Sequence, residues 1–117
     1  MRDHTKLRAF EIADFIVIEA YRVTRAFPKE EMFGLTSQIR RAAMSIASNI
    51  VEGCARSSEG DYLRFLDMAY GSAKELEYQL SVASRLGYSN ELQVIRDKTT
   101  DVSKVLNALI NSIRRSS

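Results

Sequence analysis

The sequence predicts an all-α protein folded as an antiparallel up-down-up-down four-helix bundle, and three observations support this prediction. Apolar or small residues recur every three or four positions in four separate stretches, which is the spacing of one helix face. No stretch alternates apolar and polar residues for long enough to predict a strand. The connections between the stretches are short, so consecutive helices should run in opposite directions. With 117 residues, the chain is expected to form one domain over 1–117.

The first two helices are expected at about residues 6–27 and 35–52. Pro28 ends the first, because proline disfavours helical geometry in the residue before it. Gly53 stands where a left-handed residue commonly follows a helix. The apolar face of the first helix consists of Ala13, Ile16, Val17, Ala20, Tyr21, Thr24 and Phe27. That of the second consists of Leu35, Ile39, Ala42, Ala43, Ile46 and Ile50.

The third and fourth helices are expected at about residues 59–86 and 91–114. Ser58 is a good N-cap for the third helix, and Gly87 should end it. Ser89 or Asn90 could cap the fourth. The third helix has a heptad-like face made of Tyr62, Leu66, Ala69, Ala73, Leu76, Leu80 and Ala83. The fourth buries Leu92, Ile95, Thr99, Val102, Leu106, Leu109 and Ile113.

The composition excludes several classes of protein. No stretch approaches the roughly 20 apolar residues of a membrane span, so no membrane association is expected. The single cysteine, Cys54, excludes an internal disulfide and fits a reducing, cytoplasmic location. The net charge of +2 is not that of a strongly basic nucleic-acid protein. Twelve arginines against five lysines suit bidentate contacts and interfaces, although an ordinary surface explains that ratio equally well.

The second helix contains ten consecutive residues without a charge, from Ala42 to Val51. A bundle helix with one buried face normally carries charges on the other, so this helix is expected to contact another copy of the chain. Gly71, inside an uncharged part of the third helix, is also consistent with close approach of another helix. The alternatives are a serine-rich face left in water or covered by the N-terminal arm, and a glycine without a role. The predicted subunit interface comprises Ala42, Met44, Ser45, Ser48, Asn49 and Gly71.

No arrangement of residues predicts catalysis, and we expect no enzyme activity, no cofactor and no metal. A di-iron site in a helix bundle needs two Glu-x-x-His motifs, but the chain has one histidine, His4. One histidine and one cysteine cannot build a zinc site. A nucleophilic pair of Cys54 with His4 is conceivable, but a small apolar turn residue is the better interpretation of Cys54. No two glycines have the Gly-x-Gly spacing of a phosphate-binding loop.

Four arginines near the second and third helices are candidates for binding nucleic-acid phosphates: Arg40, Arg41, Arg56 and Arg64. A weak basic patch becomes a sizeable positive field when symmetry repeats it around an oligomer. Such a field attracts RNA or DNA without reading the base sequence. The competing interpretation is that carboxylates neutralise Arg40 and Arg41, with candidates at Glu52, Glu75 and Glu77. A paired arginine would stabilise the bundle or an interface and would not be available to phosphate.

Several stretches of the chain resemble the four-helix-bundle family whose members are often called 23S rRNA intervening-sequence proteins. The central stretches are Phe27-Pro28-Lys29-Glu30-Glu31, Gly34-Leu35-Thr36-Ser37-Gln38-Ile39-Arg40-Arg41-Ala42-Ala43 and Ser45-Ile46-Ala47-Ser48-Asn49-Ile50-Val51-Glu52-Gly53. Shorter ones are Tyr62-Leu63-Arg64-Phe65-Leu66, Gly71-Ser72, Glu75-Leu76-Glu77 and Leu86-Gly87-Tyr88. The similarity covers about residues 7–90. Departures in side-chain size at Phe10–Ile12, Val51 and Ala73 concern the details of the core and not the fold.

The resemblance implies a bacterial protein that forms a homopentameric ring of small antiparallel bundles. The family is named after reading frames inside insertions of bacterial 23S rRNA genes, which favours association with RNA. A related bundle family, the accessory variability proteins of diversity-generating retroelements, is pentameric and binds nucleic acid and a reverse transcriptase. The alternative function is therefore a protein-interaction scaffold or accessory subunit, for example of a reverse transcriptase, without direct contact to nucleic acid. The low net charge favours this alternative.

Overall fold

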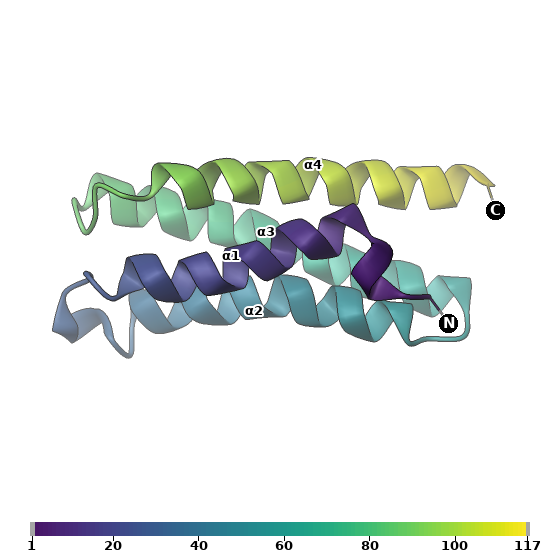
Figure 1. The fold of residues 1–117 in the computed structure, drawn as a ribbon, viewed down its shortest axis with the longest axis horizontal. Coiled ribbons are helices and arrows are strands. Elements are labelled where there is room, and N and C mark those ends of the chain that lie inside the picture. The colour runs from purple at the N-terminus through teal and green to yellow at the C-terminus, as the bar shows by residue number, and fades with distance from the viewer. Residues whose placement is uncertain (1, 117) are drawn as a thin grey trace.

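A computed structural model describes residues 2–116 as an all-α protein, which confirms the predicted fold class. The four α-helices are α1 (Arg8–Thr24), α2 (Leu35–Cys54), α3 (Glu59–Arg85) and α4 (Gln93–Ser116). Two short 3₁₀ helices, η1 (His4–Lys6) and η2 (Lys29–Glu31), precede α1 and α2. The described part of the chain contains no strand. The helices lie side by side in an elongated body of 46 × 20 × 19 Å (Figure 1).

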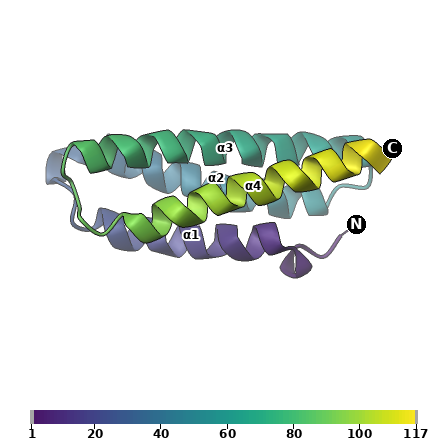
Figure 2. The same cartoon turned by 90° about the horizontal axis from the view of Figure 1, so that it is seen from above.

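Each helix packs against its neighbours in the chain, and α4 also packs against α1. Seen from above, α4 lies over the space between α1 and α3, with α2 on the far side (Figure 2). The core between the helices is aliphatic and contains side chains from all four of them. Its largest fully buried members include Ile16, Ile39, Ile46, Leu66, Leu80, Ile95 and Leu106. The bundle is thus built from the faces that the three-to-four spacing of apolar residues predicts.

Helix α1 is shorter at both ends than the predicted 6–27. At its start, the Asp3 carboxylate accepts a hydrogen bond from the Thr5 backbone N–H and holds residues 4–6 in a separate 3₁₀ turn. At its end, the Phe27 N–H donates to the Thr24 carbonyl at 3.1 Å, so the last residues form a tighter turn. Phe27 is nevertheless buried, which explains why it matched the helical spacing.

The prediction that Gly53 is a left-handed residue beyond the second helix is wrong. Gly53 is buried inside α2, which continues to Cys54, and its backbone φ is not positive. A Cβ at this position would lie 2.9 Å from the Cβ of Phe65 in α3. Glycine is needed here because the two helices approach too closely for any side chain.

The ends of α3 follow the sequence signals. The Ser58 hydroxyl accepts a hydrogen bond from the Asp61 N–H at 3.1 Å, as expected of an N-cap. Gly87 has φ +73°, and the N–H groups of Gly87 and Tyr88 donate to the carbonyls of Ser84 and Ala83. These bonds form a Schellman motif, which ends the helix. Helix α4 then begins at Gln93, two residues later than predicted.

Candidate subunit interface on the second helix

Helix α2 has an inner face that is fully buried and an outer face without charge over residues 42–51. Of the predicted interface residues, Ala42 belongs to the inner face, because none of its surface is exposed. Its assignment to a subunit interface is therefore corrected: a residue enclosed by its own bundle cannot touch another copy. Met44 and Ser48 are exposed, whereas Ser45 and Asn49 are half-buried.

Ser45 and Asn49 belong to a small polar network between α2 and α3. The hydroxyls of Ser45 and Ser72 are 2.8 Å apart and share a hydrogen bond. The Asn49 side-chain amide donates to the Ser45 carbonyl at 2.9 Å. These groups are partly satisfied within the chain, so they can be covered by another protein surface at a smaller desolvation cost than free hydroxyls.

Gly71 lies beside this network on the exposed side of α3. A Cβ placed on Gly71 would have no atom within 4 Å. No close approach inside the described chain therefore requires a glycine at this position. Either another molecule packs against it or the glycine has no packing role, and both interpretations made from the sequence stay open.

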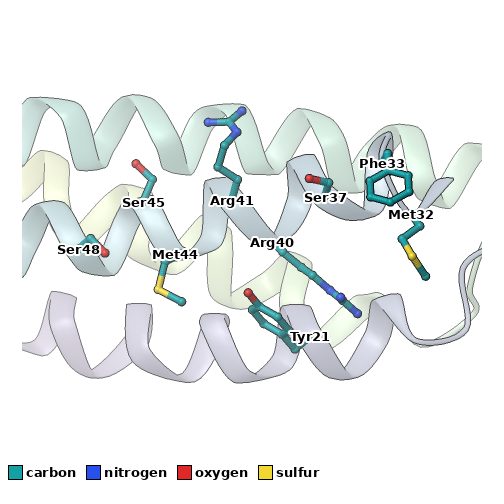
Figure 3. Close-up of a pocket in the computed structure, with 9 residues that line it drawn as sticks. All are labelled: Tyr21, Met32, Phe33, Ser37, Arg40, Arg41, Met44, Ser45 and Ser48. Atoms are coloured by element: carbon teal, nitrogen blue, oxygen red, sulfur yellow. The ribbon is translucent and has the colours of Figure 1, made fainter.

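A shallow groove of about 580 Å³ runs along the outer face of α2 (Figure 3). We call it the outer groove, and it is lined by Tyr21, Met32, Phe33, Ser37, Arg40, Arg41, Met44, Ser45 and Ser48. Figure 3 shows Arg41 and Ser45 directed toward α3, and Tyr21 and Arg40 beside each other between α1 and α2. One arginine therefore lies on each side of the outer groove, Arg41 toward α3 and Arg40 toward α1.

Large apolar side chains are exposed around the outer groove. Phe33 is 94% exposed, Met32 57% and Met44 44%. Exposed apolar patches of this kind mark contact surfaces more often than isolated exposed residues do. Sequence reasoning missed Phe33 and Met32, although two large apolar residues in a short connection were a usable signal. It also placed Tyr21 in the core, whereas this residue is 40% exposed.

Three of the four candidate phosphate-binding arginines are paired with carboxylates. Arg41 lies 3.2 Å from Glu75, which is one of the partners expected from the sequence. Arg56 lies 3.9 Å from Glu52, and Arg64 lies 3.7 Å from Asp61. All three pairs are exposed, and such pairs contribute only about 0–1 kcal/mol, so they do not lock the arginines in place.

The structure divides the four arginines between two places. The guanidinium carbons of Arg56 and Arg64 lie 4.7 and 4.6 Å from the centre of the Phe65 ring, at the end of the bundle where α2 meets α3. Arg40 and Arg41 line the outer groove. Glu75, the partner of Arg41, is ten residues beyond Phe65 in α3, which corresponds to about 15 Å along a helix. The four residues therefore do not form one patch on a single chain.

Arg40 differs from the other three because it is positioned without being neutralised. Its Nε donates to the Thr24 hydroxyl at 2.9 Å, and its guanidinium carbon lies 4.7 Å from the centre of the Tyr21 ring. Arg40 forms no ion pair within the described residues, contrary to the expectation that a carboxylate holds it. Its terminal N–H groups remain available to an anion.

The N-terminal arm does not cover the outer face of α2. The Arg2 N–H donates to the Cys54 carbonyl at 2.8 Å, and the Arg2 guanidinium lies 3.9 Å from the centre of the Tyr62 ring. The arm therefore packs against the α2–α3 end of the bundle, not against Ser45 or Ser48. The alternative in which the arm covers the serine-rich face is thus excluded.

The residues considered for chemistry lie in ordinary structural environments. Burial raises the pKa of the Cys54 thiol, which disfavours the thiolate needed for nucleophilic attack. His4 packs edge-on against Phe10, with ring centres 4.6 Å apart. Within residues 2–116, no group of three or more His, Cys, Asp or Glu side chains could hold a metal ion. Among the same residues, no helix is both long enough and apolar enough to traverse a bilayer.

Comparison with known proteins gives a family and one informative structure. The model of the family described as 23S rRNA-intervening sequence protein matches residues 5–108. Among solved structures, a protein of unknown function from the S23 ribosomal protein family of Bacteroides thetaiotaomicron is similar, with a TM-score of 0.80 and 25% identity. That match covers 88% of this chain and 95% of the other. No curated protein matches this sequence.

Proposed function

Because the chain belongs to the 23S rRNA-intervening sequence protein family, we propose that it is a non-enzymatic, oligomeric protein that associates with RNA in the bacterial cytoplasm. The observation that carries this proposal is Arg40, a cation that is held in place without a carboxylate partner. The uncharged outer face of α2 supports the oligomer, and the family name supports RNA as the nucleic acid.

The proposed subunit is an up-down-up-down bundle. Contacts between α2 and α3 support opposite directions for these two helices. Along α2, residues 41, 45 and 53 meet residues 75, 72 and 65 of α3, so the partner's number falls as the α2 number rises. A hydrogen bond of 2.6 Å from the Tyr88 hydroxyl to Glu31 joins the α1–α2 and α3–α4 connections, as expected when both lie at the same end.

The proposed assembly is a homo-oligomeric ring in which the outer face of α2 contacts a neighbouring copy, with five subunits as the resemblance implies. Two features of that face support this contact. The first is the absence of charge from Ala42 to Val51. The second is the exposure of Met44, which lies within that uncharged stretch. Burying its side chain against a second copy would contribute roughly 25 cal/mol for each Å² of apolar surface removed from water.

The proposed mode of RNA binding is electrostatic and independent of sequence. One subunit has a net charge of only +2, so a single copy would bind a polyanion weakly. A ring repeats Arg40 in every subunit and adds the fields of all copies. The exposed ion pairs of Arg41, Arg56 and Arg64 can exchange a carboxylate for a phosphate at a small free-energy cost. Binding of this kind weakens steeply as the salt concentration rises.

Retention of a structured RNA at low and moderate salt tests this function. We expect binding at low salt that decreases linearly in a plot of log affinity against log salt. Arg40→Gln should weaken binding and lower that slope, whereas Arg41→Gln, which removes an already paired neighbour, should change it less. No binding at low salt, or equal effects of the two variants, would contradict the proposal. Light scattering on the same samples reports the number of subunits independently.

The second candidate function is a scaffold or accessory subunit that binds another protein and makes no contact with nucleic acid. The observation that favours it is Phe33, which is 94% exposed and lines the outer groove beside Met32. Aromatic side chains in such positions often dominate the energy of protein–protein contacts. Partners that remain bound after nuclease treatment, and that are lost in Phe33→Ser, would favour this function over RNA binding.

A further inference from the structure

A second, smaller cavity lies where α1 turns into α2, next to the outer groove. It has a volume of about 230 Å³, and we call it the corner pocket. The residues that line it are Thr24, Arg25, Phe27, Pro28, Lys29, Met32, Thr36 and Arg40. Pockets for drug-sized ligands enclose roughly 300–1,000 Å³, so this cavity suits a smaller group.

The corner pocket carries three cations and no compensating carboxylate. None of Arg25, Lys29 and Arg40 forms an ion pair within residues 2–116. The carboxylate of Glu31 is adjacent in sequence, but both of its oxygens are occupied. One accepts from the Leu35 N–H at 2.9 Å, and the other accepts from the Tyr88 hydroxyl at 2.6 Å. These bonds leave the negative charge of Glu31 in place, but no carboxylate belongs to the lining of the pocket, which therefore contains three cations and no anion.

Thr36 supplies a second, independent indication of a ligand. Thr36 is only 6% exposed, and its hydroxyl forms no hydrogen bond within the described residues. The hydroxyl is not among the fully enclosed polar atoms that lack a partner, so a molecule in the corner pocket can reach it and accept its hydrogen bond. The other wall hydroxyl, that of Thr24, is already used, since it donates to the Ala20 carbonyl and accepts from Arg40.

We propose that the corner pocket binds a phosphate group, with Arg40 and Thr36 donating hydrogen bonds to its oxygens and Arg25 and Lys29 neutralising its charge. The Arg40 guanidinium is pre-oriented by Thr24 and Tyr21, so little side-chain entropy is lost when it binds. A terminal phosphate carries about −1.5 to −2 charges at neutral pH, whereas an internal diester carries one, so three cations favour the terminal group.

Two sources can supply this group: free phosphate and the terminal phosphate of an RNA. Only the second source rests on the proposed RNA association. Inorganic phosphate is therefore the first probe, because its binding does not depend on any RNA.

The first experiment titrates inorganic phosphate into the full chain at low ionic strength and follows binding by calorimetry. We expect saturable binding that weakens at least tenfold in Arg25→Gln and is unchanged in Arg8→Gln. The control makes the same charge change at the first residue of α1, whereas Arg25 directly follows the last residue of that helix. Absence of saturable binding, or equal weakening in both variants, would overturn the proposal.

Two further variants isolate the role of the Thr36 hydroxyl. Thr36→Val removes it at nearly constant volume and should weaken phosphate binding several-fold, whereas Thr36→Ser keeps the hydroxyl and should retain binding. If Thr36→Val does not fold, as judged by circular dichroism, the Ser variant and Arg25→Gln still decide the question. Full binding by a folded Thr36→Val would show that the Thr36 hydroxyl does not bind the phosphate.

The second experiment compares one oligoribonucleotide with a 5′-phosphate or a 5′-hydroxyl. Tighter binding of the phosphorylated form, lost in Arg25→Gln, would identify an RNA terminus as the source. Equal binding of both oligonucleotides together with saturable inorganic phosphate would identify the free ion. Failure of both oligonucleotides to bind, with inorganic phosphate still bound, would reject the proposed RNA association and keep the phosphate site.

Discussion

Small residues lie between helices α2 and α3 in two regions, and the two regions differ in how closely the helices pack. At Gly53 the contact is closed, since a Cβ there would lie 2.9 Å from the Cβ of Phe65. Around Ser45, Ser72 and Gly71 a hydrogen bond joins the helices, but a Cβ on Gly71 would meet nothing within 4 Å. Within the described chain, Gly53 therefore marks close packing of two helices and Gly71 does not.

The largest effect on stability is expected from Gly53→Ala, which disrupts the close contact between α2 and α3. The new methyl group collides with the Cβ of Phe65, an atom attached to the backbone that cannot swing away. Overpacking of this kind costs about 1–3 kcal/mol of the free energy of unfolding. Chemical denaturation of the folded chain measures the loss. A variant as stable as the parent chain would mean that the helices separate without cost at this point.

Ser45→Glu and Ser48→Glu test the open region, with the next largest effect. Ser45→Glu breaks the hydrogen bond to Ser72 and should cost about 0.5–1.5 kcal/mol in a single chain, whereas exposed Ser48→Glu should change stability by less than about 0.5 kcal/mol. Both place an unpaired charge in the proposed subunit contact and should dissociate the ring.

Light scattering at fixed concentration measures the mass of each of these variants, and denaturation at low concentration separates folding from assembly. Loss of the oligomer in Ser48→Glu without loss of folding is the informative result. A mass equal to that of the unmodified protein would contradict the interface.

Gly71→Ala should change the free energy of unfolding in the opposite direction from Gly53→Ala. Because open space surrounds Gly71, alanine should raise the stability of a single chain by about 0.8–1 kcal/mol through helix propensity. Gly60→Ala in the first turn of α3, where nothing lies within 4 Å either, is the matched control. A reduced mass in Gly71→Ala alone would place residue 71 in the subunit contact, and equal masses would show that this glycine has no packing role.

The smallest effect concerns the polar link between the two connections at Glu31. Hydrogen bonds from the Leu35 N–H and the Tyr88 hydroxyl lower the pKa of the Glu31 carboxyl. The ionised form is thus favoured in the folded chain, and its contribution to stability is complete above the unfolded pKa and is lost as the pH falls through the folded pKa. The thermal unfolding temperature should drop more on acidification below about pH 4 in the parent chain than in Glu31→Gln. An equal dependence of the unfolding temperature on pH in the two proteins would show that these bonds do not stabilise the fold.

Much of the fold could be predicted because its signals are local. Ser58 and Gly87 act at the ends of α3 through bonds to residues within five positions. The end of α1 could not be placed in the same way, because Phe27 is buried from a turn and still fits the helical period. A buried residue at helical spacing usually lies in a helix, but in such a turn it does not.

The candidate site was only partly predictable. The uncharged stretch from Ala42 to Val51 indicated the outer face of α2, but the groove also needs Tyr21 from α1 and Phe33 from the connection. A free or a carboxylate-bound state was expected for Arg40 and Arg41 together, whereas the structure pairs Arg41 with Glu75 and leaves Arg40 without a carboxylate. Whether an arginine is neutralised depends on residues that are far away in sequence.

By itself, the sequence determined the helices, their buried faces and most of their ends, because each of these depends on the spacing of apolar residues and on capping groups within a few positions. Only the tertiary structure decided which small residue is enclosed, which of Arg40 and Arg41 has a carboxylate partner, and which hydroxyl lines a cavity. These properties arise from distances between helices, such as that between Gly53 and Phe65 or between Arg40 and Thr24. No local spacing encodes them, since side chains on several helices set them together.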